Sequence, residues 1–132
     1  MAGGLILETT FLVDLERELA RGKPGPAQAL LEARSGEPLF LTFTMAGELA
    51  AGLGPGDRER WERFTAPFQV LGASAEVCWE YGKAFRYLKA NGRLIGANDL
   101  WIAAAGLAYG KAVVTRNARD YQRVPGLEVV AY

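Results

Sequence analysis

The sequence predicts an α/β fold in which helices cover both faces of a mostly parallel central sheet of about five strands. Short apolar runs alternate along the chain with longer segments of helical periodicity, the pattern typical of parallel sheets. No repeat, low-complexity tract or long linker interrupts this alternation. A chain of 132 residues, 50% of them hydrophobic, is expected to form one domain over residues 1–132.

The N-terminal third predicts one strand followed by two helices. Leu5–Leu7 is an apolar run too short for a helix and typical of a buried parallel strand. Thr10 is then expected to cap a helix whose apolar residues recur at helical spacing as far as Gly22. Pro26 suits the first position of a second helix, which Ser35-Gly36 ends.

The middle of the chain predicts two further strands with short helices between them. Leu39–Thr42 is the second apolar run. From Thr44, apolar residues at helical spacing indicate a short helix, which Gly54-Pro55-Gly56 terminates. The charged residues 57–64 indicate a further helical turn or two, and residues 68–71 form the third predicted strand.

The C-terminal part predicts two helices and two strands. Ser74 is expected to cap a long helix that ends at Asn91-Gly92. Residues 100–110 are apolar on nearly every side, as in a helix packed against a sheet. Ala112–Val114 and residues 127–130 are the last two predicted strands. The apolar face of the long helix is expected to comprise Val77, Cys78, Tyr81, Phe85 and Leu88.

The composition excludes several kinds of active site. The chain has no histidine, which rules out Ser-His-Asp and Cys-His catalysis and histidine-containing zinc sites. Its one cysteine, Cys78, can form no internal disulfide, which fits a reducing cytoplasm. The sequence contains neither a long uncharged apolar run nor a signal-peptide pattern, so we expect a cytoplasmic protein without a membrane segment. Any acid–base or metal chemistry falls to carboxylates, lysines, tyrosines or a bound cofactor.

The formal net charge is zero, but the basic residues are concentrated in one stretch. Such an asymmetry can produce a local positive field that attracts nucleic acid, although solvated helix faces explain it equally well. The basic residues of the stretch are Lys83, Arg86, Lys89, Arg93, Lys111, Arg116, Arg119 and Arg123, and its acids are Asp99 and Asp120.

Four acids occupy positions where parallel α/β sheets place their active sites, beyond the carboxyl ends of the strands. Glu8 follows the first strand and Asp120 follows the fourth. Glu48 borders the apolar face of the helix after the second strand, and Asp99 lies in the first turn of the most apolar helix. Converging carboxylates would repel one another, and a divalent cation such as Mg²⁺ or Mn²⁺ would remove that penalty and could act on a phosphate.

Each of these acids also has an ordinary explanation when it is taken alone. Glu8 could be an exposed loop carboxylate, and Glu48 could be a helix-surface residue. Asp99 could favour the positive end of its helix, and Asp120 could be a turn or capping residue. The hypothesis of a shared site therefore rests on the four acids together.

Four segments, in order, resemble the PIN-domain family and in particular its VapC-type toxins. They are LILETTFLVDL at 5–15, TMAGELAAGL at 44–53, NDLWIAA at 98–104, and TRN at 115–117 with DY at 120–121 and VPGL at 124–127. The resemblance covers nearly the whole chain and implies a PIN-like three-layer α/β/α fold. It also implies a metal-dependent endoribonuclease that hydrolyses RNA, forms a homodimer and is held inactive by a cognate VapB-type antitoxin.

The resemblance also implies roles for individual residues. Glu8, Asp99 and Asp120 would bind Mg²⁺ or Mn²⁺, and Glu48 would complete the acidic catalytic pocket. The supporting polar residues would be Thr9, Thr10, Asn98, Thr115 and Asn117. Apart from the resemblance, charge and position make Arg86, Lys89 and Arg93 on the long helix, and Arg116 and Arg119 near the acids, the candidates to bind RNA phosphates, with single-stranded or loop RNA as the substrate. Trp79, Tyr81, Tyr87 and Trp101 could stack on bases, but at helical spacing such residues are more often core or dimer contacts, and Trp101 is expected in the core.

One departure from the family pattern bears on activity. The first acid of the family is ordinarily aspartate, whereas this chain has Glu8, whose extra methylene moves the carboxylate by about 1.5 Å. The departure leaves open a catalytically weakened PIN domain that binds RNA or protein. The chain could also be a nuclease of the same fold with a different substrate. A receiver-like phosphoacceptor domain would gather acids in the same way, but the paired acids and the lysine typical of receivers are missing.

The sequence also suggests where two copies of the chain could meet. The apolar faces of the first two predicted helices are candidates for a dimer interface.

Overall fold

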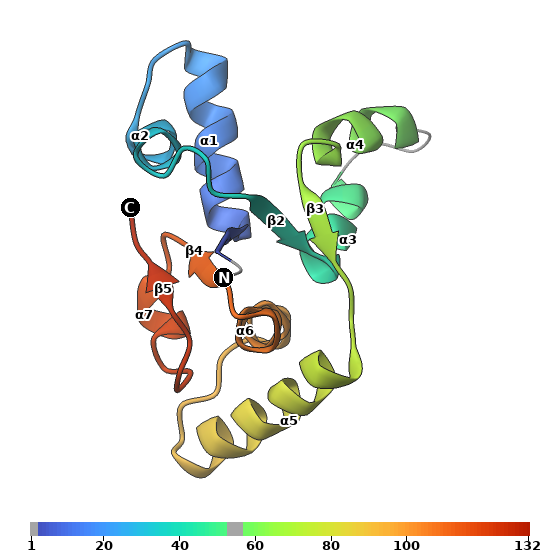
Figure 1. Ribbon diagram of the computed structural model, residues 1–132, viewed down its shortest axis with the longest axis vertical. Coiled ribbons are helices and arrows are strands. Elements are labelled where there is room, and N and C mark those ends of the chain that lie inside the picture. The colour runs from blue at the N-terminus through green and yellow to red at the C-terminus, as the bar shows by residue number, and fades with distance from the viewer. Residues whose placement is uncertain (1–2, 53–56) are drawn as a thin grey trace.

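The computed structural model describes residues 3–52 and 57–132, which contain a five-stranded, entirely parallel sheet (Figure 1). The strand order is β3-β2-β1-β4-β5, so the chain extends the sheet on one side of β1 and then crosses to the other. This arrangement confirms the predicted α/β class and the predicted strand number. The strands are β1 (Leu5–Leu7), β2 (Leu39–Thr42), β3 (Gln69–Leu71), β4 (Ala112–Val114) and β5 (Val129–Val130).

Helices lie on both sides of the sheet, with α1 and α2 on one side and α5 and α6 on the other (Figure 1). Because both faces are covered, every residue of β1 and β4 is buried. No helix in the described part of the chain is both long and apolar enough to cross a membrane. The helices are α1 (Thr9–Arg21), α2 (Pro26–Ala33), α3 (Phe43–Gly52), α4 (Arg58–Thr65), α5 (Ala75–Ala90), α6 (Ala97–Tyr109) and α7 (Ala118–Tyr121).

Helix α6 approaches the sheet closely because its inner residues are small. Ala103, Ala104 and Ala105 are fully buried. A side chain at Gly106 would place its Cβ 2.7 Å from the Leu127 side chain and 3.1 Å from the backbone oxygen of Lys111. This close approach brings the first turn of α6, which carries Asp99, to the carboxyl edge of the sheet.

Two sequence predictions about the helices are wrong in detail. Glu8, not Thr10, is the N-cap of α1, so the helix begins at Thr9. In α5 the buried residues are Val77, Ala84 and Leu88, whereas Cys78 and Phe85 are exposed. The buried face of α5 is therefore narrower than the apolar residues of the sequence indicated.

Some boundaries also differ from the predictions. Helix α6 begins at Ala97, which places Asp99 in its first turn as predicted, and β5 is shorter than the predicted 127–130. The short helix α7 was not predicted, because its four residues carry no apolar periodicity. Leu53 and the predicted helix terminator Gly54-Pro55-Gly56 lie outside the described residues.

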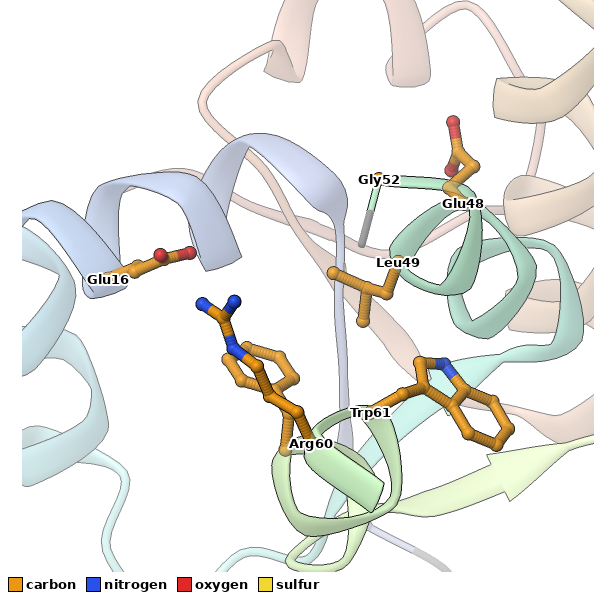
Figure 2. A pocket seen from close by; sticks show the side chains of 7 residues that line it. Glu16, Glu48, Leu49, Gly52, Arg60 and Trp61 are labelled. Carbon is orange, nitrogen blue, oxygen red and sulfur yellow. The ribbon is translucent and has the colours of Figure 1, made fainter. Parts of the chain in front are cut away.

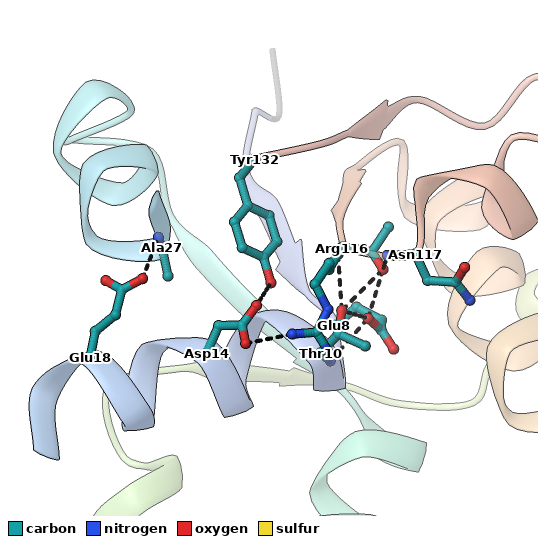
Figure 3. Close-up of polar contacts among 9 residues, drawn as sticks. Glu8, Thr10, Asp14, Glu18, Ala27, Arg116, Asn117 and Tyr132 are labelled. Carbon is teal, nitrogen blue, oxygen red and sulfur yellow. Dashed lines mark hydrogen bonds and ion pairs between the residues drawn. The ribbon is translucent and has the colours of Figure 1, made fainter. Parts of the chain in front are cut away.

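Glu18, a buried acid on α1, caps the start of α2. Its carboxylate accepts the backbone N–H of Gly25 at 3.0 Å, of Ala27 at 2.8 Å and of Gln28 at 3.0 Å (Figure 3). Burial alone would raise the pKa of Glu18, but these hydrogen bonds hold it below its ordinary value of 4.5. The carboxylate therefore joins α1 to α2 in its charged form.

We expect Glu18→Gln to reduce the acid sensitivity of the fold. A carboxyl pKa that is lower in the folded than in the unfolded chain adds stability above the ordinary value of 4.5, and this stability is lost as the pH falls below it. In a series of thermal melts, the variant should have a lower Tm at neutral pH and a shallower fall in Tm below pH 4.5. Glu16→Gln, an exposed change on the same helix, serves as the control. Equal pH dependence in Glu18→Gln and the unsubstituted chain would contradict this prediction.

Candidate active site

Glu8 lies at the carboxyl end of β1 and is only 4% exposed, so its explanation as an exposed loop residue is wrong. Its Oε1 accepts three hydrogen bonds: from Thr10 N at 3.1 Å, Thr10 Oγ1 at 2.6 Å and Thr115 Oγ1 at 2.7 Å (Figure 3). One carboxylate oxygen therefore caps α1 and also ties it to the end of β4.

Asp99 lies in the first turn of α6 and accepts a hydrogen bond from the Tyr121 hydroxyl at 3.1 Å. Burial raises the pKa of Asp99, and the negative charges of Glu8, Asp120 and Glu48 raise it further. The hydrogen bond from Tyr121 opposes both effects. The other three predicted acids thus lie close enough to Asp99 to repel its negative charge.

The other two acids are held by neutral polar side chains. Glu48 is exposed on α3 and accepts hydrogen bonds from Thr9 Oγ1 at 3.2 Å and Asn98 Nδ2 at 3.5 Å. Asp120 accepts one from Asn117 Nδ2 at 2.9 Å. Asp120 also pairs with Arg123 at 3.5 Å, the one ion pair to any of the four acids among the described residues.

The structure brings all five predicted supporting residues to the acids. Each of them bonds to one acid: Thr10 and Thr115 to Glu8, Thr9 and Asn98 to Glu48, and Asn117 to Asp120.

Tyr121 is a residue that sequence reasoning missed. It is fully buried, and its hydroxyl points at Asp99. Burial raises the pKa of Tyr121 far above its ordinary range, as do the charges of Glu8 and Asp99, so the hydroxyl stays a donor. The one signal in the sequence was a hydroxyl-bearing aromatic residue directly after Asp120.

The predicted RNA-binding residues fall into two groups. Arg86, Lys89 and Arg93 are exposed on or just after α5, where Arg86 lies 5.5 Å from the Trp79 ring. Arg116 lies beside the acids, since its backbone N–H donates to Thr10 Oγ1 at 2.9 Å. Arg119 is exposed on α7.

The predicted stacking aromatics also divide by exposure. The Trp101 ring stacks on Tyr81 with ring centres 3.9 Å apart and packs against the core, as predicted. Trp79 and Tyr87 are 60% and 49% exposed, so of the four predicted rings these two present most surface to a ligand.

A cavity of about 330 Å³ adjoins the acidic site, with Glu48 in its wall (Figure 2). Glu16 and Arg60 face each other across it. Trp61 is fixed by a hydrogen bond from its Nε1 to the Ala46 oxygen at 2.9 Å. The sequence did not indicate this cavity, because its walls come from three different helices. Its lining residues are Glu16, Glu48, Leu49, Gly52, Arg60, Trp61 and Phe64.

The chemistry of the acids suits a hard divalent cation, because every candidate ligand atom is oxygen and three neighbouring carboxylates repel the charge of Asp99. Within residues 3–52 and 57–132, however, no three acidic or cysteine side chains gather tightly enough to hold a metal ion by themselves. Mg²⁺ commonly binds through one or two carboxylates together with water and substrate phosphates. The open arrangement fits that mode of binding.

Comparison with known proteins identifies the fold family. Residues 5–127 match the family model described as PIN domain. The chain belongs to the PIN-domain family. This finding confirms the resemblance seen in the sequence and the PIN-like three-layer fold.

Several relatives of this PIN domain are VapC proteins. Ribonuclease VapC1 of Haemophilus influenzae (strain R2866) is 39% identical over 67 residues, which is 51% of this chain and 50% of that protein. The match thus spans about half the length of that relative. Ribonuclease VapC1 of Rickettsia felis is 28% identical over 96% of this chain and 95% of its own. The solved structure of VapBC-1 from nontypeable H. influenzae has a TM-score of 0.76 at 26% identity, covering 97% of both chains.

Proposed function

We propose that this PIN domain is a metal-dependent endoribonuclease, the toxin of a VapBC-type toxin–antitoxin module. The observation that carries the proposal is the convergence of Glu8, Glu48, Asp99 and Asp120 at the carboxyl edge of the sheet, where burial and the charges of the other three acids raise the pKa of Asp99. The names of the relatives, Ribonuclease VapC1 among them, support the substrate class. The substrate is single-stranded or loop RNA, whose backbone and bases are accessible.

In this proposal Asp99, Glu8 and Asp120 hold Mg²⁺ or Mn²⁺, and Glu48 completes the acidic pocket. The bound cation supplies activation of a water molecule and stabilisation of the charge that develops on the phosphate. Tyr121 orients Asp99 through its hydrogen bond of 3.1 Å.

In this proposal the basic residues bind the RNA substrate, and protein partners bind other parts of the surface. Arg116 and Arg119 bind RNA phosphates next to the acids, while Arg86, Lys89 and Arg93 bind phosphates farther along the strand. We further propose a homodimer, a cognate VapB-type antitoxin and a cytoplasmic location. The solved structure of VapBC-1 from nontypeable H. influenzae, to which this chain is similar, supports the proposal of an antitoxin partner.

The test is incubation of the purified chain with total cellular RNA and Mg²⁺ or Mn²⁺. We expect discrete cleavage products that a chelator abolishes, because the carboxylates alone offer no activated nucleophile. Thermal melts give a second measurement, in which the divalent ion should raise the Tm by relieving the repulsion around Asp99. Absence of cleavage, together with a Tm that does not respond to the ion, would refute the nuclease proposal.

A second candidate function is RNA or protein binding by a catalytically weakened PIN domain. The observation in its favour is that three donors already occupy Glu8 Oε1. If the chain is such a binding module, it would not cleave RNA, and Glu8→Asp would restore cleavage, because a shorter arm moves the carboxylate by about 1.5 Å. Comparable cleavage by both proteins would exclude this second function.

A further inference from the structure

A chain of hydrogen bonds runs from Glu8 outward to a half-exposed arginine. Thr10 Oγ1 donates to Glu8 Oε1 at 2.6 Å and accepts the backbone N–H of Arg116 at 2.9 Å (Figure 3). The backbone of Arg116 is therefore anchored to the acidic site. Its side chain, 56% exposed, extends along α1 to Asp14, where Nη1 lies 2.7 Å from Oδ1.

Asp14 is itself held on its other oxygen. The Tyr132 hydroxyl donates to Asp14 Oδ2 at 2.6 Å, and the Tyr132 ring packs edge-on against the buried Phe11 with ring centres 4.9 Å apart. Burial raises the pKa of Tyr132, and so does the hydrogen bond to Asp14, so the hydroxyl stays a donor. Both oxygens of Asp14 thus have fixed partners.

The ion pair between Arg116 and Asp14 adds little to the stability of the fold, but it fixes the position of the guanidinium. An ion pair as exposed as that of Arg116 contributes little to the free energy of folding. Within the described residues, Nε and Nη2 of Arg116 make no hydrogen bond, so they remain accessible to an incoming anion. A guanidinium offers several donors in a planar fork that suits phosphate oxygens.

We propose that Asp14 and Tyr132 are positioning residues that hold Arg116 at the rim of the acidic site to bind an RNA backbone phosphate. The inference rests on the proposed function and adds two residues to it. Asp14 fixes the guanidinium, and Tyr132 fixes Asp14. Without them Arg116 would keep its charge and its backbone hydrogen bond, but its side chain would sample other rotamers. RNA binding would then carry the entropic cost of ordering that side chain.

The direction in which Asp14→Asn changes RNA affinity separates a positioning role from a general charge effect. Asp14→Asn removes a negative charge, so long-range electrostatics alone would strengthen RNA binding. Loss of positioning would weaken it. Glu16→Gln is the matched control, because it removes the same charge from an exposed site on the same helix.

The experiment measures binding of a short fluorescein-labelled single-stranded RNA by anisotropy, with every protein carrying Asp99→Asn to prevent cleavage. We expect Arg116→Met to weaken binding about 10-fold and to lower the slope of log K against log salt by about 0.7, the loss of one phosphate contact. Asp14→Asn should weaken binding about 3-fold, and Tyr132→Phe, which keeps the ring on Phe11, about 2-fold. Glu16→Gln should not weaken it.

A double-mutant cycle completes the test. In an Arg116→Met background, Asp14→Asn should no longer weaken binding, whereas mere damage to the fold would add to the loss. Tighter or unchanged binding in Asp14→Asn, or a loss that persists without Arg116, would overturn the inference. Failure of the proposed function would be seen separately, as absence of RNA cleavage by the chain that retains Asp99.

Discussion

Asp99→Asn is expected to lower the rate of RNA cleavage by about 100-fold or more and to raise the Tm of the metal-free protein. Asparagine has nearly the same shape as aspartate, and its Oδ1 can still accept the Tyr121 hydrogen bond. It lacks the negative charge that a divalent cation requires. The loss of activity should therefore occur in a fully folded protein.

The rise in Tm follows from the direction of the pKa shift. Burial and the charges of Glu8, Asp120 and Glu48 raise the pKa of Asp99, so its ionised form destabilises the fold at neutral pH. A neutral residue removes that penalty, a trade between stability and activity that is common at active sites. Thermal melts in the presence of a chelator measure the first effect, and RNA cleavage with Mg²⁺ or Mn²⁺ measures the second.

Glu76→Gln is the control for Asp99→Asn, because Glu76 also lies in the first turn of a helix but is not among the acids that raise the pKa of Asp99. It should leave the cleavage rate unchanged. Cleavage by Asp99→Asn at the rate of the unsubstituted chain would show that Asp99 is not a metal ligand. A lower Tm would show that repulsion among the four acids does not destabilise the fold.

Tyr121→Ala is expected to cost about 3–5 kcal/mol of unfolding free energy, the usual cost of emptying the site of a large buried aromatic ring. Tyr121 is fully buried and belongs to the core cluster that contains both β1 and β4. Since a domain is typically stable by about 5–15 kcal/mol, a loss of this size removes a third or more of the stability of an average domain and would leave a domain at the lower end of that range close to unfolding. Urea unfolding measures the change.

Tyr121→Phe separates packing from the hydrogen bond. The ring remains, so the unfolding free energy should change by about 1 kcal/mol or less, because water can replace the lost donor at the partly exposed Asp99. Cleavage should still fall by about 10-fold, since Asp99 loses the donor that orients it. Full activity in Tyr121→Phe would restrict the role of Tyr121 to the core, and equal losses of stability in both variants would contradict the division between ring and hydroxyl.

Much of the fold was predictable because its signals are local. The runs Leu5–Leu7, Leu39–Thr42 and Ala112–Val114 form strands with the predicted bounds, since short, mostly apolar runs are typical of strands that a parallel sheet buries on both faces. Predictions failed where packing between helices, rather than hydrophobicity, decided which side chains are buried. In α5 the small Ala84 is buried, whereas the larger Phe85 is exposed.

The candidate site likewise has features that the sequence predicted and features that it did not. That Glu8, Glu48, Asp99 and Asp120 would meet followed from their positions relative to strands and helices. The resemblance also supplied the supporting polar residues, but which acid each of them bonds did not follow from the sequence, and Tyr121 was missed. Thr115 reaches Glu8 across 107 residues, and Tyr121 reaches Asp99 across 22.

By itself, the sequence determined the α/β class, the positions of the strands, the absence of histidine chemistry and the four acids at the carboxyl edge of the sheet. Only the tertiary structure decided that Glu8 is a buried helix cap, that Tyr121 holds Asp99, that Glu18 joins two helices, and that Arg116 extends to Asp14. The physical reason is the range of the interactions. Strand and helix formation depends on neighbours along the chain, whereas a hydrogen-bonded network depends on side chains that only packing brings together.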